Sequence, residues 1–573
     1  MTKRVRPADL IYDVDQRPPL GELVVLGLQH IAAASVYLLL PLVIAQAAGM
    51  SDSVLESAIS LSMVAMAVGV LLQAWQWKGL GSGLLVPSVP TSIYLSPSMQ
   101  AVQLGGMPLV YGMTLVAGLF EAALSRFLNR LRPYFPPEVA GVAVVIVGLE
   151  LGTLGFRKIM NLEAASFASG GVGYATAIGF GTFALSFLLS IYGKGWVRLF
   201  SSLIGIVAGY GTAVLMGLMS EKSASRLKDA ALFDLPSFSH LSFSFDPALA
   251  IPFALAGLSA MLKTVAAVTT AQKVNDSAWT RADMKQIQGG VAADGLTTAT
   301  AGLLGSSGQN SATSNIGVSA ATGATSRWIA LPIAGWLLIL ACSPKFAAVF
   351  VAMPDVVVGG SFLFVSCFVL VNGLQIIASR MLDTRRTAVV GLSIILAESR
   401  FIFPDFFKAL PESVQPFVGS SLALGITAAF LLNLVFRIGI RQREGLAYRP
   451  GVDTSETLHE FLERCGQRWG ARGMIVERAT QATVELVEAV QPMHKGAEPI
   501  LVKIAFDEYS LNIDVSYAGP PLSLKAQPPT PEEMLENPDL ALSLGGMFVA
   551  RLADRAEAVG TRESSMVKLH FEH

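Results

Sequence analysis

Long apolar runs follow one another from about Gly21 to Ile440, and polar or charged residues gather in the short segments between them. We count about fourteen runs, most of them near the roughly 20 residues that a helix needs to cross a bilayer. Beyond Arg449 the apolar positions recur at the spacing of amphipathic helices and strands, among many charges. In this last part, LVKIAFDEYSLNIDVSY (501–517) alternates as paired strands do.

These patterns predict an all-α polytopic membrane protein that carries a small α+β cytoplasmic domain. Its predicted parts are a cytoplasmic N-terminal segment at 1–20, a transmembrane region at 21–440, a linker at 441–454 and a cytoplasmic domain at 455–573. Only 14% of the 573 residues are charged, whereas soluble domains carry about 25%. The net charge of −1 leaves no basic field for nucleic acid, so no nucleic-acid partner is expected.

Lysines and arginines concentrate in alternate connections and at both ends of the transmembrane region. The connections concerned lie at 126–132, 194–198, 273–285 and 380–386. The positive-inside rule therefore predicts two cytoplasmic termini and an even number of spans. One longer loop, at 220–245, breaks the pattern because it also carries lysines and an arginine. The first apolar run is too long for a signal-peptide core, so we expect no cleaved signal. The repeated apolar runs predict a multi-pass protein of the cell (inner) membrane.

Two runs are short, broken by Gly or Pro, and rich in Ser and Thr: GSGLLVPSVPTSIYLSPSM (81–99) and GSSGQNSATSNIGVSAATG (305–323). As the third and tenth spans they lie seven apart, which predicts a 7+7 inverted repeat. Interrupted spans at matched positions indicate a transporter site, because their half-helices expose unpaired backbone groups at the membrane midplane. The alternative is that both are helices kinked at Gly and Pro.

Five segments carry recognisable motifs in order along the chain: GLQHIAAASVYLLLPLVIAQAAG (27–49), GLGSGLLVPSVPTSIYLSPSM (79–99), YFPPEVAGVAVVIVGLELG (134–152), GGVAADGL (289–296) and NIGVSAATGATSR (315–327). Together they resemble the nucleobase–ascorbate transporters, also called the nucleobase–cation symporter-2 or xanthine/uracil permease family. The resemblance implies a core domain and a gate domain, with short strands in spans three and ten. It also implies that xanthine, uracil or related bases cross the lipid membrane with a coupling proton or sodium ion, carried by a homodimer.

The same resemblance implies substrate contacts in spans one and three. The family's span-one histidine is His30, which either shapes the site or only packs between helices. In TSIYL, Ile93 takes the place of an aromatic residue that stacks on the base, and the backbone of Ser92 and Ile93 can bond a ligand edge. On a strand, Tyr94 would point to the opposite face from Ile93.

In span ten the family's Gln or Glu falls on Ser314 and the following Asn on Asn315. Asn315 can keep a hydrogen-bonding role, but Ser314 is too short to replace a bidentate amide or carboxylate. The amides of Gln309 and Asn310 lie upstream and match only if the alignment shifts locally. Arg327, which closes the motif, is expected to have a solvated or bridging role at the cytoplasmic end.

Span eight departs most from the family. Where its relatives carry a substrate-binding acid, this chain has Lys263, and a second acid one turn later is Ala267. The span-nine aspartate is kept as Asp294. An acid inside a membrane is rare and usually has a partner, so we expect Asp294 to pair with Lys263 or to relay a proton. The alternative for Asp294 is a structural acid that bonds helix ends.

A charge at the centre of a single span costs roughly 2.5–3.5 kcal/mol on insertion scales. Lys263 lies too far from either end of its apolar run to snorkel, so it is expected to be neutral or paired, with Asp294 or with an anion. An ammonium group offers donors only. It therefore suits a substrate with acceptors and negative charge, such as urate, better than uracil. Lys263 is predicted to bind the substrate and to take part in proton or ion coupling.

The predicted domain at 455–573 resembles, more weakly, the ATP-binding domains of histidine kinases and anti-sigma-factor kinases (GHKL ATPases). The family's magnesium-holding Asn corresponds to Ala489, four residues after Glu485, and its adenine-reading Asp corresponds to Tyr517. We therefore expect no ATP cofactor and no kinase activity, and interpret the domain as a degenerate regulatory module with a cytoplasmic protein partner. An unrelated α+β domain remains the alternative.

Three functional classes follow from these observations. The first is a secondary-active transporter of a nucleobase-like substrate, in which the core moves against the gate like an elevator. The second is a transporter-like sensor that signals through its C-terminal domain. The third is an ATP-driven enzyme, which the missing Asn and Asp argue against. We therefore expect a transporter that is not an enzyme and needs no cofactor.

Overall fold

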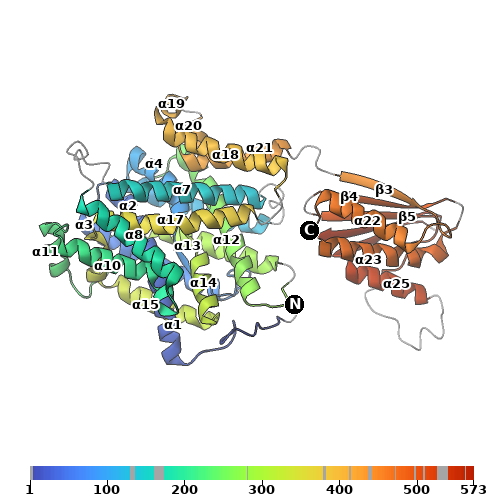
Figure 1. Ribbon diagram of the computed structural model, residues 1–573, viewed down its shortest axis with the longest axis horizontal. Helices are drawn as coiled ribbons and strands as arrows, with labels where there is room; N and C mark the ends of the chain where they lie inside the picture. Colours follow the sequence, from blue (N-terminus) through green and yellow to red (C-terminus); the bar gives the residue numbers. More distant parts are fainter. Residues whose placement is uncertain are drawn as a thin grey trace. The chain divides into compact units, whose positions relative to one another are not determined.

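The computed structural model describes residues 4–128, 136–160, 173–279, 282–378, 382–411, 414–436, 442–471, 473–495, 498–507, 510–524, 540–561 and 563–572. The chain divides into a membrane unit, Met1–Asn433, and a C-terminal unit, Leu434–His573. Figure 1 draws the first as a bundle of helices and the second as a sheet with helices. Six arginines that entered the topology prediction lie outside the described residues: Arg130, Arg132, Arg281, Arg380, Arg437 and Arg441.

One set of elements in the membrane unit, here called the core group, packs around α3, α5 and α13. Its helices and strands are α1 (Leu20–Ala34), η1 (Ser35–Leu38), α2 (Leu39–Ala47), α3 (Asp52–Ala74), β1 (Ser88–Pro90), η2 (Ser92–Tyr94), α4 (Leu95–Gly105), α5 (Met107–Leu124), η3 (Ser125–Phe127), α11 (Glu221–Asp229), η5 (Pro247–Leu249), α12 (Ala250–Val274), α13 (Met284–Leu303), β2 (Gln309–Ser311), α14 (Thr313–Thr322), η6 (Arg327–Ile329), α15 (Ala330–Ala341) and α16 (Pro344–Val351).

The remaining helices of the membrane unit, here called the gate group, pack mainly against one another, with α7 against α17 and α8 against α10. They are α7 (Pro137–Met160), α8 (Tyr174–Tyr192), α9 (Trp196–Leu199), α10 (Ser201–Leu215), α17 (Asp355–Ile377), α18 (Thr384–Ile402), α19 (Pro404–Lys408), α20 (Gln415–Val418) and α21 (Ser421–Phe436). Each group thus combines segments from both halves of the sequence, as an inverted repeat requires.

Seven of the described helices are long and apolar enough to cross a membrane. The segments Arg327–Ala341 and Pro344–Val351, which bend by 78° at their junction, would make an eighth span. These helices make the chain a multi-pass membrane protein. The count of fourteen stays a prediction, because the third and tenth predicted spans are not continuous helices. Each is a strand followed by a short helix.

The two strands expected in the broken runs are present. β1 and β2 pair antiparallel, with Ser88 opposite Ser311, Val89 opposite Asn310 and Pro90 opposite Gln309. All six of their residues are buried. The pairing satisfies part of the backbone that the interrupted helices leave open, which allows irregular backbone inside a membrane protein.

Glycines let α5 and α13 approach closely at the centre of the core group. A Cβ atom added to Gly118 would lie 2.5 Å from the carbonyl oxygen of Gly295 and 2.3 Å from the backbone nitrogen of Ala299. A Cβ atom on Gly295 would lie 2.7 Å from the carbonyl oxygen of Gly118. Small residues at such contacts are typical of helix pairs in membranes. This contact fixes the position of α13, which carries Asp294.

The C-terminal unit holds a five-stranded antiparallel sheet in the order β3-β4-β5-β7-β6. Its strands and helices are β3 (Gln442–Tyr448), α22 (Ser455–Trp469), α23 (Gly473–Val490), η7 (Gln491–Met493), β4 (Ile500–Phe506), β5 (Ser510–Tyr517), α25 (Leu540–Leu552), β6 (Arg555–Gly560) and β7 (Ser565–Glu572). Helices α22, α23 and α25 lie along one face of the sheet (Figure 1).

The alternating pattern at 501–517 predicted the hairpin of β4 and β5 correctly. The predicted linker at 441–454 is wrong in its first half. β3 pairs with β4 along its whole length and forms an edge of the sheet. β3 reads QREGLAY, which lacks a regular alternation of apolar and polar residues, so its strand character was hidden in the sequence. The folded unit therefore begins before the predicted boundary at 455.

Candidate functional site

A cavity of about 970 Å³ lies between the core group and the gate group. The core group contributes η1, η2, α12 and α14, and the gate group contributes α7, α9 and α17. Polar residues in its wall include Tyr37, Ser92, Arg198, Lys263, Ser314, Asn372 and Gln375. The gate side also adds apolar and aromatic surface, including Val147, Phe364 and Phe368. Convergent polar groups on an apolar wall are typical of a small-molecule site.

Four of the predicted site residues meet in this cavity: Ser92, Ile93, Lys263 and Ser314. Ser92 and Ile93 belong to the short helical turn η2 directly after β1. Ser314 lies in the first turn of α14, after β2, and its hydroxyl is 3.3 Å from that of Tyr37. The paired strands therefore bring the two half-helix starts to one site, as the broken runs predicted.

Lys263 is half-buried on α12 and lines the cavity. Within the described part of the chain, no hydrogen bond or ion pair holds its ammonium group. None of the cavity-lining residues that the structure describes is an aspartate or a glutamate. The described part of the cavity wall therefore combines basic side chains with no acidic one.

The expected ion pair between Lys263 and Asp294 is absent from the described residues. Asp294 is fully buried on α13 and does not line the cavity. Five donors surround its carboxylate: Gln73 Nε2 at 3.2 Å and Ser88 Oγ at 2.8 Å from Oδ1, and Thr264 Oγ1 at 2.5 Å, Asn310 Nδ2 at 3.3 Å and Ser311 N at 2.9 Å from Oδ2. The bonded residues come from α3, α12 and both strands, so Asp294 ties the interrupted segments together.

Three other predicted residues lie outside the cavity wall. Tyr94 is fully buried behind it, with its hydroxyl 3.5 Å from Glu121 Oε2 and its ring tilted against Phe253. His30 is buried on α1, with Nε2 at 3.5 Å from the hydroxyl of Ser319. Asn315 is buried on α14, and its amide has no hydrogen bond within the described residues. Ile93 lines the cavity and Tyr94 does not, but both belong to the helical turn η2, so the predicted strand geometry is wrong at these residues.

The upstream amides of β2 also turn away from the cavity. Gln309 donates to the carbonyl oxygen of Ser62 at 2.9 Å, and Asn310 donates to Thr264 Oγ1 at 2.8 Å. Both therefore hold β2 against neighbouring helices. The structure leaves Ser314 as the residue at the cavity, as the unshifted alignment predicted.

Three buried glutamates of the membrane unit were missed: Glu121, Glu138 and Glu150. Glu121 on α5 is fully buried, and its Oε2 lies near the hydroxyl of Tyr94. The sequence signal was a single glutamate in the apolar run GLFEAAL (118–124). An intramembrane acid is a candidate functional residue by default, but Glu121 does not line the cavity.

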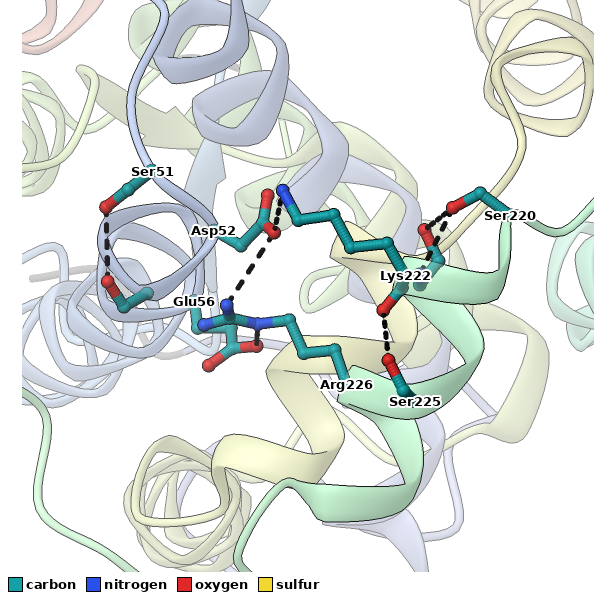
Figure 2. Close-up of polar contacts among 9 residues, drawn as sticks. Ser51, Asp52, Glu56, Ser220, Lys222, Ser225 and Arg226 are labelled. Atoms are coloured by element: carbon teal, nitrogen blue, oxygen red, sulfur yellow. Dashed lines mark hydrogen bonds and ion pairs between the residues drawn. The ribbon is translucent and has the colours of Figure 1, made fainter.

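The loop that broke the positive-inside pattern has a local explanation, shown in Figure 2. On α11, Lys222 Nζ lies 3.0 Å from Asp52 Oδ2, and Arg226 Nη1 lies 3.6 Å from the same oxygen. Arg226 Nε is also 2.6 Å from Glu56 Oε1. Acids at the start of α3 thus neutralise these two cations. Lys222 and Arg226 therefore attach the loop to α3, and this role accounts for their presence in a loop where the positive-inside rule predicts few cations.

The N-terminal segment is bound across the turn between α14 and η6. The backbone nitrogen of Ile11 donates to the carbonyl oxygen of Gly323 at 2.7 Å, and that of Thr325 donates to Tyr12 at 2.9 Å. Arg327 Nη2 lies 2.5 Å from Asp15 Oδ1. Arg327 therefore has the bridging role that the sequence predicted.

In the C-terminal unit, the hydroxyl of Tyr517 is hydrogen-bonded to the backbone of the segment that follows it. Its hydroxyl donates to the carbonyl oxygen of Pro520 and accepts from the backbone nitrogen of Leu522, both at 2.9 Å. Helix α25 packs directly on α23, because a Cβ atom on Gly545 would lie 2.7 Å from that of Ala489. Tyr517 and Ala489, which replace the Asp and the Asn of the ATP-binding domains, are therefore both occupied by contacts within the C-terminal unit.

With this geometry in view, comparisons with known proteins identify the membrane unit. A family model described as Permease family, covering xanthine and uracil permeases, matches residues 21–405. The chain belongs to the xanthine/uracil permease family. It is therefore a membrane transporter and not an enzyme. The family model ends before the C-terminal unit, so it identifies the membrane unit only.

Three similar relatives span most of the permease length. A Clostridium perfringens (strain 13 / Type A) protein that carries the name purine permease is 30% identical over 437 residues, 75% of this chain and 93% of its own. The xanthine permeases XanP and XanQ of Escherichia coli K12 are 27% and 28% identical, covering 75% and 79% of this chain and 95% and 98% of their own. These names favour a transporter over a sensor.

Solved structures show the same fold at low identity. Murine Solute Carrier 26 family member A9, described as an anion transporter in the inward-facing state, aligns with a TM-score of 0.52 and 11% identity. The alignment covers 77% of this chain and 72% of that one. At this identity the likeness supports the fold alone.

Proposed function

We propose that this permease moves an anionic purine-type nucleobase, of which urate is the model, across the inner membrane as a secondary-active transporter. The names of the relatives, purine permease and xanthine permease, support a nucleobase. The proposal that the substrate is anionic rests on Lys263, which lines a cavity without a described carboxylate in its wall. A proton or a sodium ion is the proposed coupling ion.

The chemistry of Lys263 separates substrate classes. An ammonium group only donates hydrogen bonds, so it complements ionised or carbonyl oxygens and deprotonated ring nitrogens. A neutral base that presents N–H groups to this position would leave both its own donor and the ammonium without an acceptor. A buried charge without a partner is strongly unfavourable, so an anion that enters the cavity supplies the missing partner.

The proposed movement is an elevator-like displacement of the core group against the gate group. Two features support it. The cavity has walls from both groups, and the core group carries both half-helix starts as well as Lys263. The substrate would therefore travel with the core group while apolar residues of α7 and α17 slide past it. In this proposal both termini are cytoplasmic and the permease works as a homodimer.

We assign the coupling role to Lys263 in preference to Asp294. Lys263 lines the cavity, so its charge can change when a substrate or a proton arrives. Asp294 is enclosed by five donors that also hold the strand pair, which favours its structural role. The C-terminal unit is proposed to regulate transport through a cytoplasmic protein partner.

Transport by the full chain in proteoliposomes tests the substrate class. Uptake of urate and of uracil is compared for the wild type, Lys263→Ala, Lys263→Glu and Lys273→Ala. Lys273 is a matched control, because it is exposed at the end of the same helix and lies over Trp279, outside the cavity.

We expect Lys263→Ala to lower urate uptake by roughly tenfold or more, since one charge-assisted contact is lost. Lys263→Glu should abolish urate uptake, and Lys273→Ala should leave it unchanged. Equal urate uptake by the wild type and both Lys263 variants would exclude Lys263 as a determinant. A wild type that carries uracil but not urate would refute the anionic substrate itself.

A further inference from the structure

The cavity carries a second cation, at the connection between α8 and α10. Arg198 lies on the short helix α9, is exposed, and lines the cavity together with Gly195. Because these lining residues are also exposed, the cavity reaches the surface of the membrane unit at this connection. Arg198 therefore lies at the mouth of the cavity, whereas Lys263 lies at the middle of α12.

Unlike three other arginines of the membrane unit, Arg198 has no acidic partner among the residues that the structure describes. Arg226 binds Glu56, Arg327 binds Asp15 and Arg386 binds Glu138. No hydrogen bond or ion pair of the Arg198 side chain is found in the same described residues. Its guanidinium group is thus free to bind a ligand at the mouth.

The two cavity cations belong to different helix groups. Lys263 is on the core group, and Arg198 is on the connection of the gate group. If the core group moves as proposed, Lys263 moves with the substrate while Arg198 stays at the mouth. A guanidinium group presents its donors as a planar fork that matches an oxyanion or the edge of an anionic base, and it stacks on aromatic planes. Such a residue can hold an anion before Lys263 receives it.

We propose that Arg198 is a specificity-determining residue that captures anionic substrate at the mouth of the cavity and passes it to Lys263. This inference rests on the proposed anionic substrate. The mouth lies on the cytoplasmic side if the distribution of Lys and Arg gives the correct orientation. Positive charge at a cavity mouth raises the local concentration of anions, and salt weakens this effect.

The test measures urate transport by the full chain in vesicles of both orientations. The variants are Arg198→Gln, Arg198→Lys and Lys194→Gln. Lys194 is the matched control, because it carries the same charge in the same connection, is exposed, and does not line the cavity. Uracil is the neutral probe. KM and the maximal rate are determined separately at low and high salt.

We expect Arg198→Gln to raise the KM for urate by roughly three- to tenfold at the cytoplasmic face, with little change in maximal rate. High salt should raise the wild-type KM and narrow the difference from the variant. Arg198→Lys keeps the charge but loses the planar fork, so its KM should lie between those of the wild type and Arg198→Gln. Lys194→Gln should leave the KM for urate unchanged, and none of the three substitutions should change the transport of uracil.

An unchanged KM in Arg198→Gln, with urate uptake still dependent on Lys263, would overturn this inference and leave the proposed function intact. Equal defects in Arg198→Gln and Lys194→Gln would also overturn it, since both cations would then act on lipid headgroups or on the protein as a whole. No urate transport by the wild type would overturn the proposed function together with this inference.

Discussion

The hydroxyl of Thr264 lies 2.5 Å from Oδ2 of Asp294, while Lys263, the preceding residue on α12, lines the cavity and forms no ion pair with that acid. Consecutive residues of an α-helix differ by about 100° around its axis. One face of α12 therefore closes the buried network of the core group, and the adjacent face offers a cation to the cavity. Asp294 is held by Thr264 and the strand pair, and it makes no ion pair with Lys263 among the described residues.

Replacement of Asp294 by Asn should destabilise the protein. The amide nitrogen of Asn would face donors where the carboxylate accepts five bonds. Breaking a buried charged network of this kind lowers the free energy of unfolding by about 3–5 kcal/mol.

Thermal unfolding of purified protein in detergent measures the change. Lys263→Ala is the control, because Lys263 lacks a partner in the described residues, and it should unfold near the wild-type temperature. Equal stability of Asp294→Asn and the wild type would contradict the network.

Replacement of Gly118 by Ala should force α5 and α13 apart. The new methyl group would lie 2.3 Å from the backbone nitrogen of Ala299, and backbone atoms cannot move away without shifting the helix. We expect the free energy of unfolding to fall by about 1–3 kcal/mol. Gly335→Ala on α15 is the matched control, since a Cβ atom there meets no other atom within 4 Å. If the two variants unfold alike, the helices are not packed as closely as described.

The ion pair of Glu56 and Arg226 should contribute measurably to the attachment of α11. Their side chains are 13% and 32% exposed, and their contact is 2.6 Å long. We expect a coupling energy of about 1 kcal/mol at low salt, decreasing at high salt. A double-mutant cycle with Glu56→Ala and Arg226→Ala measures it. Lys228→Ala serves as the control, because Lys228 has no ion pair among the described residues. A coupling energy of zero at low salt would count against the pair shown in Figure 2.

Cys465 in the C-terminal unit should react slowly with thiol reagents. Burial and the neighbouring carboxylate of Glu444, 3.6 Å from Sγ, raise the pKa of its thiol from 9.0 to about 11. Since the folded state favours the neutral thiol, this stabilising contribution is complete below about pH 9 and is lost as the pH rises through about 11. Maleimide labelling of a Cys342→Ser, Cys367→Ser variant, followed against pH, measures the midpoint. Glu444→Gln should lower that midpoint. A midpoint near 9 with Glu444 present would refute the shift.

The sequence by itself determined the elements whose signal is local. Apolar runs of membrane length, the two interruptions, the β4–β5 hairpin and the family motifs can each be recognised within one segment, whereas the short strands β1 and β2 followed from the resemblance to the family. The positions of Ser92, Ile93, Lys263 and Ser314 at one cavity also followed from matching those motifs to the family. Period and composition suffice in these cases, because the physical constraint acts within a single helix or strand.

Only the tertiary structure decided which charged and polar groups are partners. The sequence favoured Lys263 as the partner of Asp294. In the structure, α12 is rotated so that Thr264 bonds Asp294, together with Ser88 and Ser311 of the strand pair. The same holds for Glu121 beside Tyr94, for Arg226 beside Glu56, and for β3, whose pairing with β4 makes it part of the sheet. Such contacts depend on how separate helices are rotated and placed against one another. No spacing along the chain records that arrangement, because it results from the packing of all the elements together.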